Sequence, residues 1–313
     1  MISSDNTSAW DSGTVAAYCI VVAVWATTPL AIKWSGEALP PLLAAGSRMF
    51  LAVCIGGLWL LWRRQRLPCD RLALKSYLAA VPGIFGAMAC SYQGAQYLPS
   101  GLISVIFGLA PLLSGLMMQC QRGAHHFTAW HWLGCLMGLS GLAWIFSDSL
   151  RLLWHSQQLG LHGVGLLWLL AAVTLFAASG IAVKQVGAGL KPMQQTMGGL
   201  LLSLPFYGLA IFWSVDVWQF DSSNTRGLLA IVYLSIMGSL VGFYSYFHVL
   251  SRLPAATVAL VTLMTPVLAL LLGWAVNQEQ LAPHMLQGSV LILISLGIYL
   301  LGDRRVRQAL VRN

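Results

Sequence analysis

Long apolar stretches follow one another along this chain, and they limit it to one class of fold. Its 313 residues are 58% hydrophobic and 8% charged, whereas a soluble domain carries about 25% charged residues. A stretch of roughly 17–25 apolar residues spans a bilayer as a helix, and the sequence can be divided into ten such stretches. We therefore predict an all-α, multi-pass membrane protein in contact with a lipid bilayer. The predicted spans are 14–33, 41–62, 76–97, 100–119, 130–147, 163–184, 193–213, 227–250, 255–276 and 285–302.

A repeated pattern divides the chain into two halves. The segment Trp25–Lys33 returns loosely as Phe176–Lys184, at an offset of 151 (176 − 25). The Leu-Pro pair that precedes Pro111 returns before Pro266, at an offset of 155 (266 − 111). The repetition predicts two equivalent halves of five spans each.

Five spans per half, an odd number, make the equivalent helices of the two halves cross the membrane in opposite directions. Inverted repeats of this kind are a common plan for secondary transporters. We predict a first repeat at 15–147 (helices one to five), a second repeat at 163–302 (helices six to ten) and a basic cytoplasmic tail at 303–313.

The distribution of charge predicts the orientation. Basic residues crowd the loop at 63–75 and the segment that follows the last span, whereas the loops on the opposite side carry acidic residues and few basic ones. By the positive-inside rule, both termini then lie in the cytoplasm. The same rule accounts for the net charge of +8, so we expect no nucleic-acid partner.

One arginine, Arg48, lies about eight residues inside the second predicted span, where an unpaired charge costs several kcal/mol. It either binds an anion or carboxylate in a cavity, or it is a structural arginine that bonds backbone carbonyls or extends toward the membrane surface. No Asp or Glu lies deep inside any predicted span. Cation transport through a buried carboxylate is therefore disfavoured.

Helices three and eight carry polar and aromatic residues near their ends. Tyr92 and Gln96, with Gln93 between them, and Tyr244 with His248 are spaced so that each pair shares a helix face. Lining a cavity, they would bond an amino-acid-sized solute, and the rings would contact an ammonium group. The alternative is an interfacial belt of aromatic residues. His248 is also the candidate for a proton-linked step, because its ordinary pKa is near neutral.

Three prolines lie inside predicted spans. Pro111 and Pro266 occupy matching positions in helices four and nine, and Pro29 lies in helix one. A proline in a membrane helix frees backbone carbonyls, which is tolerated beside a cavity or a packed neighbour. Thr262 and Thr265 precede Pro266 and are placed to satisfy such carbonyls. The prolines are either kinks that let the helix bundles move or simple packing kinks.

Two lysines, Lys33 and Lys184, occupy equivalent positions at the ends of helices one and six. They are either anchors that extend to the membrane surface or gates that close alternately on the two faces. Gly134-x-x-x-Gly138 in helix five permits close helix approach, which indicates either packing within the chain or a homodimer interface.

Several kinds of chemistry have no motif here. The sequence has no phosphate-binding Gly-x-x-x-x-Gly-Lys-Ser/Thr loop, no His-Glu-x-x-His and no Gly-x-Ser-x-Gly element. His125, His126 and His131 lie close in sequence without nearby acidic or cysteine ligands, and we interpret them as a loop feature. We expect no catalytic residues, no metal and no cofactor.

Together these patterns resemble the EamA-type transporters of the drug/metabolite transporter superfamily, over nearly the whole chain. The resemblance rests on Trp25–Lys33, on Arg48 followed by Met-Phe-Leu, on the Leu-Pro openings of helices four and nine, and on Glu279 after helix nine. The first half has Gln-Arg-Gly-Ala-His-His where a matching glutamate would stand. The resemblance implies a ten-helix carrier of the bacterial inner membrane, with a central cavity lined mainly by helices one, three, four, six, eight and nine. Many members of the family export amino acids or related metabolites.

The predicted function is alternating-access export of a small metabolite, most simply an amino acid. A sugar-phosphate or nucleotide-sugar antiporter of the same fold is one alternative, and a membrane-embedded enzyme or sensor is another. The predicted substrate-binding residues are Trp25, Thr28, Arg48, Tyr92, Gln93, Gln96, Tyr244, His248 and Thr262, and the predicted gating or kink residues are Pro29, Lys33, Pro111, Lys184 and Pro266.

Overall fold

The protein is a bundle of long helices. The computed structural model describes residues 11–119, 128–145, 147, 160–214, 223–253, 255–279 and 282–312, and every regular element within those ranges is helical. This agrees with the apolar composition, because a backbone in a bilayer must satisfy its polar groups internally. Among the described residues, seven helical stretches are long and apolar enough to cross a membrane, and two shorter apolar helices end at Asn277 and Tyr299.

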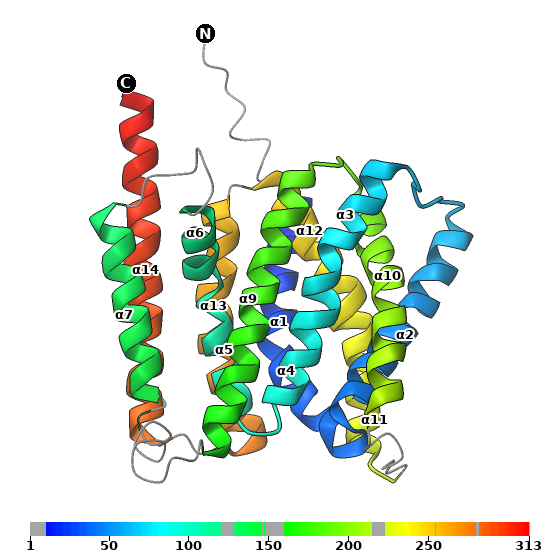
Figure 1. Cartoon of the computed structure of the whole chain (residues 1–313), viewed down its shortest axis with the longest axis horizontal. Coiled ribbons are helices and arrows are strands. Elements are labelled where there is room, and N and C mark those ends of the chain that lie inside the picture. The colour runs from blue at the N-terminus through cyan, green and yellow to red at the C-terminus, as the bar shows by residue number, and fades with distance from the viewer. Residues whose placement is uncertain are drawn as a thin grey trace.

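The first half consists of helices that cross the bundle, and α3, η1 and α4 form one continuous stretch of them (Figure 1). They are α1 (Ser12–Ala38), α2 (Pro41–Trp62), α3 (Arg71–Val81), the π-helix η1 (Pro82–Ala87), α4 (Met88–Gly94), α5 (Ser100–Phe107), α6 (Ala110–Gln119) and α7 (Ala129–Ile145).

The second half repeats this order. Its elements are α9 (Leu161–Val186), α10 (Pro192–Trp213), α11 (Thr225–Tyr233), the π-helix η2 (Leu234–Val241), α12 (Gly242–Arg252), α13 (Ala255–Asn277) and α14 (Pro283–Arg312). Helix α14 continues through the segment predicted as a basic tail, and its last turns project beyond the bundle in Figure 1.

A π-helical segment interrupts the third helix of each half. Segment η1 separates α3 from α4, and η2 separates α11 from α12. The apolar pattern predicted continuous helices at 76–97 and 227–250, because it does not distinguish α from π geometry. Segments of this kind occur frequently at functional sites, and here they lie at matching places in the two halves.

The fourth predicted span is divided near its middle. Helix α5 ends at Phe107, Gly108 and Leu109 form a turn, and Pro111 lies in the first turn of α6. In a continuous helix the Pro111 ring would clash with the carbonyl of Phe107, and the proline has no N–H to donate. Pro111 therefore begins a helical segment, whereas Pro29 and Pro266 lie inside α1 and α13.

Helices α7 and α14 form a closely packed pair at one side of the bundle (Figure 1). A Cβ atom at Gly134 would lie 2.9 Å from the Ser295 carbonyl oxygen, and one at Gly141 would lie 2.9 Å from the Gly288 carbonyl oxygen. The small residues of α7 thus serve packing within the chain. A homodimer stays a prediction.

Candidate functional site

A cavity opens in the middle of the bundle. Its volume is about 80 Å³. It lies between the two halves, since both contribute to its wall. The lining residues are Trp25, Thr28, Pro29 and Ile32 from α1, Arg48 from α2, Met88 and Ser91 from α4, Ile103, Ser104 and Phe107 from α5, Phe176 from α9, Gly238 from η2, Phe243 from α12 and Thr265 from α13.

Arg48 is the charged residue of this lining. Its side chain is 1% exposed, its Nε donates to the Ser239 hydroxyl at 2.8 Å, and its Nη1 has no hydrogen-bond partner. No carboxylate of the described residues pairs with it. A buried cation without a counter-ion is costly, so the site favours an anionic group that enters the cavity.

The π-helix η2 holds this guanidinium in place. Gly238 lets the side chain lie against the backbone, because a Cβ there would be 2.9 Å from Arg48 Nη2. The next residue, Ser239, is fully buried and also donates to the Met49 sulfur at 3.5 Å. Arg48 is therefore positioned by the opposite half of the chain.

Aromatic rings form a second wall of the site. The Trp25 ring lies 5.7 Å from the Phe176 ring and 5.1 Å from the Tyr246 ring, and Phe107 lies 5.9 Å from Phe176. Such rings offer apolar area and, through their faces, a weak attraction for a cation. The wall suits the apolar or ammonium part of a solute.

Hydroxyl groups complete the lining. The Thr28 hydroxyl donates to the Val24 carbonyl at 2.7 Å, one turn before Pro29. This bond leaves the lone pairs of the threonine oxygen available to a solute. Ser91 likewise donates back to the Ala87 carbonyl at 2.7 Å. The hydroxyls of Thr28 and Ser91 therefore present acceptors rather than donors.

The polar residues predicted on helices three and eight lie outside this lining. Tyr92 is 1% exposed, and its hydroxyl has no hydrogen-bond partner. The Gln96 amide donates a hydrogen bond of 2.7 Å to the Gln93 side-chain oxygen, and neither glutamine lines the cavity. Tyr244 is 40% exposed and stacks on His248, whose Nε2 lies 3.5 Å from the Thr14 hydroxyl. Substrate contact by these five residues stays a prediction.

Three further predicted residues are placed as follows. The side chain of Thr262 lies outside the described residues, whereas its neighbour Thr265 lines the cavity. Pro266 is buried inside α13. Lys184 is exposed in the last turn of α9.

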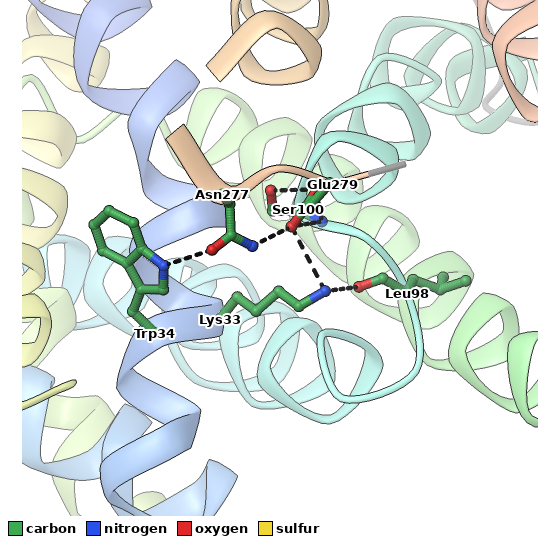
Figure 2. Close-up of polar contacts among 6 residues, drawn as sticks. All are labelled: Lys33, Trp34, Leu98, Ser100, Asn277 and Glu279. Atoms are coloured by element: carbon green, nitrogen blue, oxygen red, sulfur yellow. Dashed lines mark hydrogen bonds and ion pairs between the residues drawn. The ribbon is translucent and has the colours of Figure 1, made fainter. Parts of the chain in front are cut away.

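Lys33 belongs to a polar cluster at one end of the bundle, shown in Figure 2. Its ammonium lies 3.5 Å from Glu279 Oε1 and 3.5 Å from the Leu98 carbonyl oxygen. The Glu279 carboxylate also accepts hydrogen bonds from the Ser100 backbone N–H, the Ser100 hydroxyl and the Asn277 amide. The cluster thus joins the ends of α1, α5 and α13.

Sequence reasoning did not find Gly238, Ser239 or the structural role of Glu279. Glycine and serine inside an apolar stretch carry no signal that separates them from packing residues. Glu279 stood out only as a family feature, because its partners Lys33 and Ser100 are far away in the chain. Within the described residues, no group of three or more His, Cys, Asp or Glu could hold a metal ion.

The model of the EamA-like transporter family matches this chain twice, at residues 12–147 and 163–301. This chain belongs to the EamA-like transporter family. It is a multi-span membrane transporter, and its two family matches cover both halves of the fold described above.

Two bacterial transporters and one solved structure resemble this chain along most of its length. An uncharacterized transporter of Bacillus subtilis, YoaV, is 25% identical over 87% of this chain and 91% of its own length. An uncharacterized inner membrane transporter of Escherichia coli, YedA, is 24% identical over 93% of each chain. A solved crystal structure superimposes with a TM-score of 0.62 and 20% identity, covering 94% of this chain and 99% of the other. That likeness shows the fold.

Proposed function

We propose that this EamA-like transporter exports small carboxylate-bearing metabolites, amino acids first, by alternating access across a bacterial inner membrane. In the proposed topology ten helices form two inverted repeats, and both termini lie in the cytoplasm. The observation that carries the proposal is Arg48: a buried guanidinium, unpaired by any described carboxylate, in the wall of a central cavity.

The cavity suits the parts of an amino acid. A carboxylate would meet Arg48, since a guanidinium binds a carboxylate through parallel hydrogen bonds. An ammonium group would meet the oxygens of Thr28 and Ser91 and the face of Trp25. No acidic side chain is among the lining residues, so the carboxylate provides the main electrostatic contact.

A thermal-shift screen of the purified protein against amino acids, sugar-phosphates, nucleosides and aromatic amines would test the proposal, followed by flux of each ligand into liposomes. Arg48→Gln should weaken binding by about 30-fold or more, because loss of one partner of a buried charged pair costs about 2–5 kcal/mol. Arg63→Gln is the matched control, since Arg63 is exposed and lies over the Trp59 and Trp62 rings.

Stabilisation by amino acids that is lost in Arg48→Gln and kept in Arg63→Gln would support the proposal. Unchanged uptake of every carboxylate by Arg48→Gln would contradict it. A guanidinium binds phosphate as well as carboxylate. Stabilisation only by phosphorylated sugars, with uptake that depends on a counter-substrate, would move the function to the antiporter alternative.

A further inference from the structure

We propose that Glu279 is the latch that closes the cavity at the Lys33 end, and that its contacts with Lys33 and Ser100 break each time the cavity opens there. The inference rests on the alternating-access function proposed above. It adds to the transport cycle a residue that is not among those lining the cavity.

The cluster lies directly beyond the cavity on the helices that form its wall. On α1, Ile32 lines the cavity and Lys33 is the next residue. On α5, Ser100 precedes the lining residue Ser104 by four residues, about 6 Å along a helix. Figure 2 shows Lys33, Ser100 and Glu279 converging from three separate segments. Contacts that tie these segments together close the space between them.

Both carboxylate oxygens of Glu279 are engaged. Oε2 accepts from the Ser100 N–H at 3.0 Å and the Ser100 hydroxyl at 2.9 Å, and Oε1 accepts from Asn277 at 2.9 Å and lies 3.5 Å from Lys33. The Glu279 side chain is 8% exposed. Charge-assisted bonds in such a buried place are stronger than those at a surface.

Helix α13 approaches this carboxylate closely. A Cβ atom at Gly273 would lie 2.7 Å from Glu279 Oε2 and 3.2 Å from the Ser100 hydroxyl. The glycine therefore leaves room for the carboxylate between α13 and α5. The Lys33 side chain, in contrast, is 34% exposed, so water can replace its contacts when the cluster opens.

Another ion pair that includes α1 provides a matched control. Arg226 pairs with Glu37 and joins α11 to the last turns of α1, and the two side chains are 57% and 36% exposed. Neither residue of this pair bonds Glu279 directly, although Arg226 lies over the ring of Trp34, which bonds Asn277. If any ion pair near the end of α1 closed the cavity, both pairs would matter; if the proposal is correct, only the Glu279 cluster does.

The experiment measures access to the cavity from the Lys33 end. The six native cysteines are replaced, Ser104→Cys is introduced as a reporter, and a membrane-impermeant thiol reagent is added to vesicles of each orientation. Glu279→Gln should be labelled about tenfold faster from one side, because loss of a charge-assisted pair shifts an open–closed equilibrium by about that factor. Glu37→Gln should be labelled at the rate of the parent.

Two results would overturn the latch. One is an unchanged labelling rate in Glu279→Gln; the other is an equal increase in Glu37→Gln. Lys33→Met combined with Glu279→Gln should exceed the effect of Glu279→Gln alone only by the loss of the Lys33 contact with the Leu98 carbonyl, because the ion pair of Lys33 is with the same carboxylate.

A covalent version of the latch keeps the test independent of how well Glu279→Gln folds. Lys33→Cys with Glu279→Cys, joined by a short cleavable thiol cross-linker, should stop transport until the linker is reduced. Continued transport by the cross-linked protein would contradict the latch. Failure of the proposed function gives a different result. If the cavity binds no candidate substrate, none of them will protect the Ser104→Cys reporter from the thiol reagent in the protein with an intact latch.

Discussion

The two halves of this transporter place different chemistry against their π-helical segments. In the second half, η2 receives Arg48 from α2, whose Nε donates to Ser239 at 2.8 Å. In the first half, η1 receives Tyr207 from α10, whose hydroxyl donates to the Ile84 carbonyl at 2.9 Å. One contact holds a buried charge at the cavity, and the other is a neutral bond within the packed core.

This difference distinguishes the helical scaffold from the candidate site. The order of helices is repeated in the two halves, and the second helix of each half contacts the π-helix of the other. The charge is present on one side only. In the proposed inverted repeat, the two halves would move symmetrically while the proposed substrate site stays asymmetric, because the buried charge lies against η2 alone.

Substitution of Gly238 by alanine should produce the largest effect on transport, with the matching Gly86 as its control. Gly86 and Gly238 are the fifth residues of η1 and η2. The Cβ atom of Gly238→Ala would lie 2.9 Å from Arg48 Nη2 and 3.3 Å from its Cζ, so the guanidinium must move. Because a misplacement of about 1 Å can cost about a hundredfold in rate, we expect a comparable loss of liposome transport.

Gly86→Ala is the control in the other half. Its Cβ would meet only the end of the Leu175 side chain, at 2.9 Å, which can shift at small cost. Transport should fall by less than about threefold. Equal losses in the two variants would show that the π-helices matter only for packing, and that the asymmetry has no functional meaning.

The partners of Arg48 and Tyr207 should differ in what they control. Ser239→Ala removes the acceptor of Arg48 Nε, and a hydrogen bond to a charged group contributes about 1.5–3 kcal/mol. We expect substrate affinity to fall about tenfold, measured by titration of the thermal shift. Tyr207→Phe should instead lower unfolding stability by about 1 kcal/mol and leave affinity within about twofold. A reversal of the two outcomes would contradict the assignment.

The frame was predictable from the sequence, whereas most of the site was not. Apolar length and the Trp25–Lys33 repeat predict the helices, and a lone arginine in an apolar stretch predicts a buried charge. The partners of that charge depend on how two distant segments meet. Ser239 is 191 residues from Arg48, and neither its type nor its spacing distinguishes it from other buried serines.

A second asymmetry concerns Glu279, which opens the last loop of the second half and has no matching glutamate in the first half. Burial by itself would raise the pKa of the Glu279 carboxyl, but the Asn277 hydrogen bond, the Lys33 charge and the Ser100 bonds together hold that pKa below its ordinary value of 4.5. The stabilisation is therefore fully present above 4.5 and is lost as the pH falls through the lower folded-state pKa.

We expect the melting temperature of the purified protein to fall more steeply below pH 4.5 than that of Glu279→Gln. The variant lacks the titrating group, so its own decline reflects the other carboxylates. Glu37→Gln should follow the parent curve, because its exposed ion pair contributes little. Parallel curves for the parent and Glu279→Gln would refute a stabilising role for this carboxylate.

The smallest effect on transport should come from the exposed member of a matching pair of tyrosines. Tyr92 and Tyr244 are 152 residues apart (244 − 92), yet Tyr92 is 1% exposed and Tyr244 is 40% exposed. Tyr244→Phe and His248→Gln should change transport by less than about twofold, as is usual for surface positions. A larger loss would support the predicted role of this pair in substrate binding.

Tyr92→Phe should raise the stability of the protein, whereas an ordinary core substitution lowers it. The Tyr92 hydroxyl is buried without a hydrogen-bond partner, and an unsatisfied buried hydroxyl costs about 1–3 kcal/mol. Its removal should raise the melting temperature measured without substrate. If the hydroxyl bonds the substrate when the cavity is filled, the same variant will lose affinity while gaining stability. A gain in stability with unchanged affinity would place Tyr92 in the scaffold, and Arg48 would then act without it.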